Sequence, residues 1–215
     1  MLNKKKVLYF GICILIVAIF ICVVKNQYTI LTSHDNVECS KRFGIIDGNL
    51  SYVHNNVQNK NYTIVEGDKT HGDEILEFLQ LYSSDCCFYY YDVEEEDRID
   101  SKSILDGLKW MLKNDVNCVS ISLSSKYYYS DMENWLNKHS GEITVYASYN
   151  NHLNTLDYPA KYNRVIGVGS SKKIEKKEND IIFKNNKVIL FVSGIKYYKG
   201  NSVLTPYAMV RDNYN

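Results

Sequence analysis

The sequence predicts an α/β fold in which a mostly parallel sheet carries helices on both of its faces. Short apolar segments rich in β-branched and aromatic residues alternate with longer segments whose apolar positions repeat at helical spacing. The segment 86–93 (CCFYYYDV) is apolar on both of its faces, which is typical of a central parallel strand. Such an alternation implies right-handed βαβ units.

The elements follow one another from residue 42. The predicted strands are 42–47, 86–93, 119–123, 143–147 and 164–169. Predicted helices begin at His71, behind a cap at Ser103, and at Asp131, because apolar residues recur there at helical spacing. The short segments 181–183 and 188–192 are expected to form a hairpin around two asparagines.

The segment from Gly200 to Val210 is typical of a loop that leads into a helix. Pro206 is expected in the first helical turn, where the N–H that it lacks would be unpaired in any case. Ser202 would then lie at the positive end of the helix dipole. It is either an ordinary N-cap or a nucleophile whose reaction generates an oxyanion.

The N-terminal region has the pattern of a membrane anchor. Residues 1–6 include three lysines, and 7–24 is an uncharged, mostly apolar run of 18 residues that ends before Lys25. This length just suffices to cross a hydrocarbon core of about 30 Å. We expect a cytoplasmic N-terminus, a transmembrane helix at 7–24, a linker at 25–41 and an extracytoplasmic domain at 42–215. A cleaved signal peptide is the alternative, but no A-x-A-like site follows the run.

Composition restricts the partners and cofactors. The chain has 25 basic and 25 acidic residues, so its charge does not indicate a nucleic-acid partner. Its six cysteines form no C-x-x-C pair and have no histidine at ligand spacing, and therefore no metal and no cofactor are predicted. Cys39 and Cys86 could pair in an oxidising compartment, but the sequence does not establish the bond.

Four polar residues stand where an α/β sheet carries its chemistry. Asp47 ends the first strand and His71 begins the next helix. Asn150 follows the strand 143–147, and Ser202 begins the last helix. Sites in parallel sheets lie at the carboxyl ends of the strands. Each residue alone has a commoner structural role, but together they supply the nucleophile, base, carboxylate and oxyanion donor of a hydrolytic serine.

Several local sequences resemble those of the subtilisin-like serine peptidases, and the match extends from about residue 42 to residue 210. The segments that carry it are GIID at 44–47, His71-Gly72, 106–123, 145–150, YPAKY at 158–162 with VIGVG at 165–169, and Gly200-x-Ser202-x-x-Thr205-Pro206. The order Asp, His, Ser along the chain is also that of the family.

The resemblance implies a three-layer subtilisin-like sandwich that is truncated at its C-terminus, since only 13 residues follow Ser202. It implies a serine endopeptidase in which Ser202 attacks, His71 is the base, and Asp47 orients His71. Asn150 would hold the oxyanion, and the residues expected to line the substrate cleft are Ser122, Leu123 and Ser124. A cis bond before Pro159 is also implied. No calcium is expected, because the segment after His71 is too short for the family's calcium loop.

Departures from the family pattern favour a second hypothesis about the function. Tyr149 stands where a glycine usually precedes the oxyanion asparagine, and Asp73-Glu74 replaces the usual Thr-His after His71-Gly72. The alternative is a catalytically degenerate domain that binds a peptide or partner through the same cleft. For the peptidase, the expected partners are a peptide or protein substrate, such as a secreted peptide, and the membrane. A partner chain or the membrane surface would cover the short C-terminal region.

Overall fold

The computed structural model describes residues 4–32, 42–61, 63–83, 86–95, 98–152, 155–170, 175–191 and 194–213. Its central element is a seven-stranded sheet in the order β10-β9-β8-β7-β2-β4-β3, in which every pair of neighbours is parallel. These strands are β2 (Phe43–Asp47), β3 (Val57–Asn61), β4 (Phe88–Asp92), β7 (Cys118–Ile121), β8 (Thr144–Ser148), β9 (Val165–Ser170) and β10 (Ile181–Phe183). The predicted parallel sheet is therefore confirmed.

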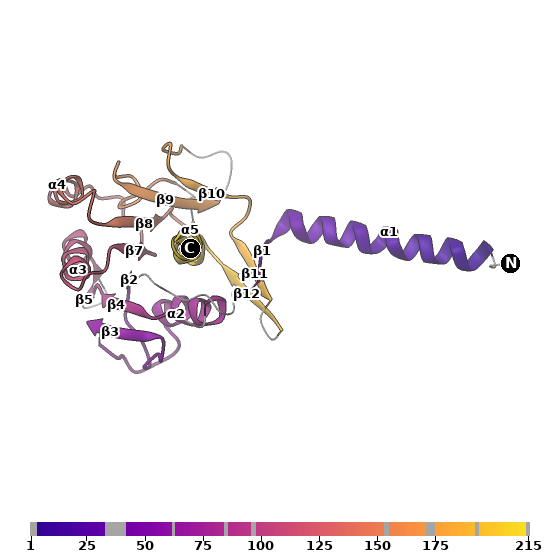
Figure 1. Ribbon diagram of the computed structural model, residues 1–215, viewed down its shortest axis with the longest axis horizontal. Coiled ribbons are helices and arrows are strands. Elements are labelled where there is room, and N and C mark those ends of the chain that lie inside the picture. Colours follow the sequence, from indigo (N-terminus) through magenta and orange to yellow (C-terminus); the bar gives the residue numbers. More distant parts are fainter. Residues whose placement is uncertain are drawn as a thin grey trace.

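Helices cover both faces of this sheet, as predicted. They are α2 (His71–Tyr82), α3 (Ser101–Lys113), α4 (Ser130–Lys138) and α5 (Asn201–Asp212). Figure 1 shows α3 and α4 on one side of the sheet and α2 and α5 on the other. Each side has its own apolar core. The start of α3 differs by one turn from the prediction, because Asp100 caps the helix by accepting from the Ser103 backbone N–H at 2.6 Å.

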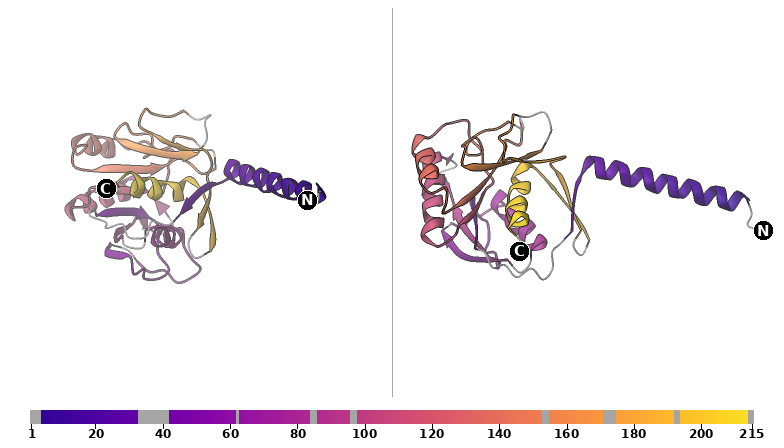
Figure 2. Two further views of the ribbon diagram at one scale, coloured as in Figure 1. Left: turned by 45° about the vertical axis from the view of Figure 1, so that its right-hand side comes forward. Right: turned by 45° about the horizontal axis from the view of Figure 1, so that its top comes forward.

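A second, three-stranded sheet lies beyond α5 (Figures 1 and 2). Its order is β1-β11-β12, with strands β1 (Thr29–Thr32), β11 (Lys187–Phe191) and β12 (Ile195–Lys199). The inner side chains Leu31, Val188 and Leu190 join the core that surrounds α2 and α5. A short antiparallel pair, β5 (Glu94–Glu95) with β6 (Arg98–Ile99), completes the strands of the described residues.

The hairpin predicted from 181–183 and 188–192 is wrong. The first segment is β10, which pairs in parallel with β9 at the edge of the main sheet. The second is β11, which pairs with β12 on one side and β1 on the other. The physical reason lies in the packing, because Ile181 and Ile182 pack against the two opposite cores of the main sheet. Alternation alone cannot tell which sheet a short strand joins.

The last helix is confirmed, and it is held more firmly than its place near the end of the chain suggested. Nine of the twelve residues of α5 are buried. The helix contacts β7, β8 and β9 on one side and α2 and β12 on the others. Full burial of an apolar side chain such as Leu204 or Met209 contributes roughly 1.5–3 kcal/mol. Among the described residues, contacts with both sheets and with α2 therefore hold α5 in place.

The N-terminal segment forms helix α1 (Lys4–Gln27), which projects away from the domain and leads into β1 (Figure 1). Over the part of the chain that the structure describes, no helix is both long enough and apolar enough to cross a membrane. The transmembrane helix predicted at 7–24 is accordingly not confirmed. Cys86 is disulfide-bonded, whereas its candidate partner Cys39 lies outside the described residues.

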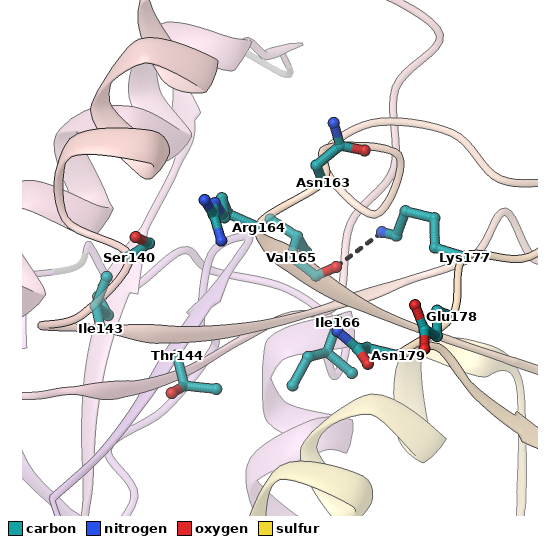
Figure 3. Close-up of a pocket in the computed structure, with 10 residues that line it drawn as sticks. All are labelled: Ser140, Ile143, Thr144, Asn163, Arg164, Val165, Ile166, Lys177, Glu178 and Asn179. Carbon is teal, nitrogen blue, oxygen red and sulfur yellow. Dashed lines mark hydrogen bonds between the residues drawn. The ribbon is translucent and has the colours of Figure 1, made fainter.

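A polar cavity of about 380 Å³ opens at the amino edge of the sheet, beside the first residues of β8 and β9. Lys177 is one of the residues that line it. Lys177 Nζ donates to the carbonyl oxygen of Val165 at 2.7 Å (Figure 3). It donates as well to the carbonyl oxygens of Tyr162, at 3.0 Å, and Ala160. It also forms an ion pair at 3.3 Å with Asp180, whose side chain is fully buried. Burial lowers the pKa of Lys177, although the Asp180 carboxylate opposes this effect.

We expect Lys177→Met to lower the free energy of unfolding by about 3 kcal/mol, because the buried Asp180 loses its cation and the carbonyls lose their donor. The measurement is urea unfolding followed by far-UV circular dichroism. Lys176→Met, which removes the exposed neighbouring lysine, is the matched control and should shift the midpoint little. Equal midpoints for the two variants would contradict a structural role for Lys177.

Candidate functional site

A cavity of about 350 Å³ opens at the carboxyl edge of the main sheet, where the sequence predicted the site. It is lined by Asp47, Gly48, His71, Ser122, Leu123, Ser124, Ser148, Tyr149, Asn150, Asn151 and His152. The three residues expected along the cleft, 122–124, therefore do line it. Because the carboxyl ends of β2, β7 and β8 meet at this edge, residues distant in the sequence share one cavity.

Asp47 and His71 form a direct pair on one wall of the cavity. His71 Nδ1 lies 2.8 Å from Asp47 Oδ1, which also accepts from the Gly48 backbone N–H at 2.8 Å. Asp47 is fully buried, whereas the His71 side chain is 41% exposed. The Asp47 charge raises the pKa of His71 to about 9, against the opposing effect of burial. With Nδ1 facing Asp47, Nε2 is the ring nitrogen that can act as a base in the neutral form of the imidazole, which the raised pKa makes the minor form below about pH 9.

The first turn of α2 holds His71 in place. Thr70 is the N-cap, and it exchanges hydrogen bonds with Asp73 in a capping box. Gly72 packs so closely that a Cβ there would lie 2.1 Å from the hydroxyl of Tyr90. The Asp73 carboxylate accepts from Ser51 and Thr70. Of the two acidic residues in this turn, Glu74 contributes to the raised pKa of His71.

Ser202 is the second residue of α5, and it is bonded to two residues that line the cavity, Asn151 and Ser122. Gly200 is the N-cap, so Ser202 is not the ordinary N-cap that the sequence left open. Gly200 has φ of 125°, and a Cβ on it would lie 3.1 Å from both Ser202 Oγ and the Asn151 amide. This position therefore requires glycine, and the close approach brings Asn151 against the serine.

A side chain from the cleft replaces a missing helix bond at Ser202. Pro206 is the sixth residue of α5 and not part of its first turn, which corrects the sequence prediction. It has no N–H to donate to the carbonyl of Ser202, four residues earlier. Ser122 Oγ donates to that carbonyl instead, at 2.8 Å. Proline is thus tolerated inside the helix, and Ser202 is tied to the wall formed by residues 122–124.

Asn151 lies beside Ser202, and the predicted Asn150 does not. Asn151 Nδ2 donates to Ser202 Oγ at 3.3 Å, and its Oδ1 accepts from the Asn201 backbone N–H at 2.5 Å. Asn150 points elsewhere, because its Nδ2 donates to Asp157 at 2.9 Å. The sequence offers no signal that separates the two adjacent asparagines, since the choice depends on how the loop after β8 turns.

Tyr149 is accommodated without backbone strain. Among the described residues, Asp115 is the one non-glycine residue with a positive φ, so Tyr149 does not occupy a glycine conformation. Its buried ring lies over Gly167 and Gly169, where a Cβ would approach it to 2.6 Å. Its hydroxyl donates to Asp180 at 2.6 Å. The departure from the family pattern at Tyr149 is thus compensated by two glycines of β9.

No hydrogen bond joins the Asp47–His71 pair to the Ser202–Asn151 pair within the described residues. Ser202 Oγ and His71 each make contact with their own partner instead. The arrangement supplies a hydroxyl in the first turn of a helix, an imidazole oriented by a carboxylate, and an amide donor at one edge. These are the parts of nucleophilic acyl transfer. The bond between Tyr158 and Pro159 is cis, as the resemblance implied.

Comparison with known proteins gives one family and several similar folds. A family model described as the subtilase family matches residues 81–207. This range includes Ser202 and Asn151 and leaves out Asp47 and His71. Among curated proteins, no sequence matches the chain.

Solved structures with a similar fold include three proteases. A lanthipeptide protease is 17% identical, with a TM-score of 0.64 over 80% of this chain and 72% of that one. The prenylagaramide maturation protease PagA is 13% identical, with a TM-score of 0.61 over 80% and 73%. A cold-adapted subtilisin-like serine proteinase is 14% identical, with a TM-score of 0.59 over 84% and 79%. At these identities the likeness extends to the fold alone.

The Asp47–His71 pair should make stability depend on pH in a defined direction. The pKa of His71 is about 9 in the folded state and about 6.5 in an unfolded chain. The pair therefore stabilises the fold fully below about pH 6.5, and this stabilisation is lost as the pH rises through about 9. We expect the free energy of unfolding of the wild type relative to His71→Gln to fall between pH 6 and pH 10.

Urea denaturation across that range is the measurement, and the change should be modest because solvent screens the half-exposed imidazole. His152→Gln, which alters another histidine of the same cavity, is the control and should show no such trend relative to the wild type. A difference between wild type and His71→Gln that does not change with pH would contradict the raised pKa.

Proposed function

The chain belongs to the subtilase family, and on this basis we propose that it is a serine endopeptidase that uses Asp47, His71 and Ser202. The observation that carries the proposal is that two preformed pairs meet at one cavity, which is lined by Asp47, His71 and Asn151. Asp47 and His71 are joined at 2.8 Å, and Ser202 and Asn151 are joined at 3.3 Å. Both pairs lie at the carboxyl edge of the sheet, the edge at which α/β proteins carry their ligands.

The proposed reaction begins with attack of Ser202 Oγ on the carbonyl carbon of the scissile peptide bond. His71 Nε2 takes the hydroxyl proton, while Asp47 holds the tautomer in which Nδ1 carries hydrogen and stabilises the imidazolium that forms. The Asn151 amide and the Ser202 backbone N–H donate to the oxyanion. His71 then protonates the leaving amine as the C–N bond breaks. Water next attacks the acyl carbonyl while His71 takes its proton, and His71 returns that proton to Ser202 Oγ as the carboxylic acid leaves.

The Ser202–His71 hydrogen bond must form for this reaction. Catalytic hydrogen bonds are often long or poorly aligned in ligand-free proteins and tighten when substrate binds. Ser202 Oγ makes its described contact with Asn151, whose amide would be recruited by the oxyanion of a bound substrate. Substrate binding would thereby release the hydroxyl toward His71.

Fluorophosphonate labelling tests the proposed nucleophile. The wild type should form one covalent adduct, which peptide mass spectrometry should locate at Ser202, and Ser202→Ala should form none. Ser140→Ala, which removes a serine at the opposite edge of the sheet, is the control and should label like the wild type. Labelling that persists in Ser202→Ala, or that is absent from the folded wild type, would refute the peptidase function.

The adjacent asparagines provide a matched test of the oxyanion site. We expect Asn151→Ala to lower the second-order rate of fluorophosphonate labelling on the order of 10²–10³-fold, the typical effect of losing one oxyanion donor. Asn150→Ala should have a much smaller effect, because its side chain bonds to Asp157. Thermal melting of both variants separates a local effect from unfolding. A slower rate for Asn150→Ala than for Asn151→Ala would reverse the assignment.

A catalytically inactive binding domain is the second candidate, and the observation that favours it is the unformed contact between Ser202 and His71. A domain of this kind would bind peptide in the cavity along residues 122–124 and leave the peptide intact. It would also remain unlabelled by fluorophosphonate although it is folded.

The proposed substrate class is a peptide or a protein, and maturation of a secreted peptide would fit it. Two of the similar folds support this proposal by their descriptions, since one is a lanthipeptide protease and the other a prenylagaramide maturation protease.

The location of the chain is a separate proposal that rests on the sequence. The three lysines in residues 1–6 and the apolar run at 7–24 favour a cytoplasmic N-terminus and a tethered domain outside the cytoplasm. A chain that alkaline carbonate extracts completely from host membranes would contradict this proposal. A partner chain that covers the C-terminal region likewise stays a prediction.

A further inference from the structure

A second histidine–carboxylate pair lies beside the candidate site and takes no part in the proposed reaction. His54 Nε2 is 2.8 Å from Asp73 Oδ1, and the two side chains are 1% and 0% exposed. Burial of a polar pair is costly unless every group has its hydrogen bonds. The free-energy cost of burying this pair raises the question of what it contributes to the structure.

Asp73 is the centre of a saturated hydrogen-bond cluster. Its Oδ2 accepts from Ser51 Oγ at 2.6 Å, from the Ser51 backbone N–H at 3.0 Å, and from the backbone N–H and Oγ of Thr70, both at 2.9 Å. Together with His54 these donors fill the roughly four acceptor sites of a carboxylate. Burial would raise the pKa of Asp73, but the donors from Ser51, His54 and Thr70 hold it at about 2.

The donors come from two different parts of the chain. Thr70 is the N-cap of α2, one residue before His71. Ser51 and His54 belong to the loop that follows Asp47 at the end of β2. The cluster therefore joins the segment that carries the carboxylate to the helix that carries the imidazole, close to both. The separation of Asp47 and His71 depends on how these two segments are held together.

We propose that His54 and Asp73 are positioning residues that lock the loop after Asp47 against the first turn of α2 and so keep Asp47 and His71 in hydrogen-bonding contact. This role rests on the proposed function for its consequence in catalysis, but the geometric part stands without it. Asp73 occupies one of the positions at which the chain departs from the family pattern, and the departure supplies the buried acceptor.

The surroundings of His54 make its hydrogen bond, and not an exposed charge, the element that matters. The ring of Tyr52 stacks on the imidazole with centroids 4.3 Å apart. The charged groups that face His54 are Asp73 and Glu77, and Glu77 is itself engaged by Lys69 and by the Tyr52 hydroxyl. A neutral side chain that donates from the position of Nε2 should therefore preserve the lock.

The test compares His54→Gln, which keeps a donor near that position, with His54→Phe, which keeps the ring volume and removes the donor. In the full chain carrying Ser202→Ala, the pKa of His71 is measured by NMR titration of its ring protons, a readout that needs no activity. The charged neighbours that raise the pKa of His71 are Asp47 and Glu74. We expect His54→Phe to move the midpoint from about 9 toward the ordinary value near 6.5, and His54→Gln to leave it near that of the parent.

The same substitutions are then made in the chain that retains Ser202, and the rate of fluorophosphonate labelling is measured. Misplacement of a catalytic group by about 1 Å can cost on the order of 100-fold. We expect at least a tenfold loss for His54→Phe and recovery to within about threefold for His54→Gln. A general loss of stability would instead lower the melting temperature without moving the His71 midpoint of the folded protein.

An unchanged His71 midpoint in folded His54→Phe would overturn the proposal. If His54→Phe does not fold, Ser51→Ala replaces it, since this change removes a hydroxyl donor to Asp73 from the same loop. The same shift is then expected, and its absence is again decisive against the proposal. A shifted midpoint combined with no labelling of any variant would refute the peptidase function and leave the positioning role in place.

Discussion

The burial of α5 is the constraint on which the rest of the structure depends. A helix enclosed between two sheets cannot leave a backbone carbonyl without a donor, because water does not reach it. Pro206 creates such a carbonyl at Ser202, and Ser122 satisfies it from β7's side of the cavity. Burial of the helix therefore requires a donor for this carbonyl, and the hydrogen bond from Ser122 that meets the requirement also holds Ser202 in place. Gly200 completes the arrangement, since its conformation admits Asn151 against the serine.

The site is assembled from two parts of the chain, and one of these parts matches the subtilase family model. The part that carries Asn151 and Ser202 falls within the range that matches the subtilase family model. The part that carries Asp47 and His71 lies before that range, and its assignment relies on the geometry of the pair. The first part is thus supported by descent and the second by physical contact. The loop from Ser51 to His54 belongs to the second part, and it is bonded to α2 through the Asp73 carboxylate.

Much of the fold could be predicted because its central elements bury apolar side chains in a regular pattern. Strand β4 and helix α2 are examples, since their apolar runs have the length and period of the elements that they form. Strands β3 and β12 escaped prediction, because VQNKN and IKYYK carry few aliphatic residues and each packs one side chain, Val57 or Tyr198, against the core. The site followed the same division. Asp47 and His71 end or begin regular elements, whereas the choice between Asn150 and Asn151 depends on a loop conformation that no local pattern encodes.

The pairing of β1 with β11 has a consequence for how the molecule is made. Thr29 is the register partner of Val188, so a strand near the beginning of the chain completes the layer over α5 with a strand near its end. The N-terminus of a chain leaves the ribosome first. Strand β1 can therefore pair with β11 only after nearly the whole domain has been synthesised. Contacts between residues so distant in sequence form slowly, because a long loop has to close first. Until β1 has paired with β11, α5 lacks part of the outer layer that buries it.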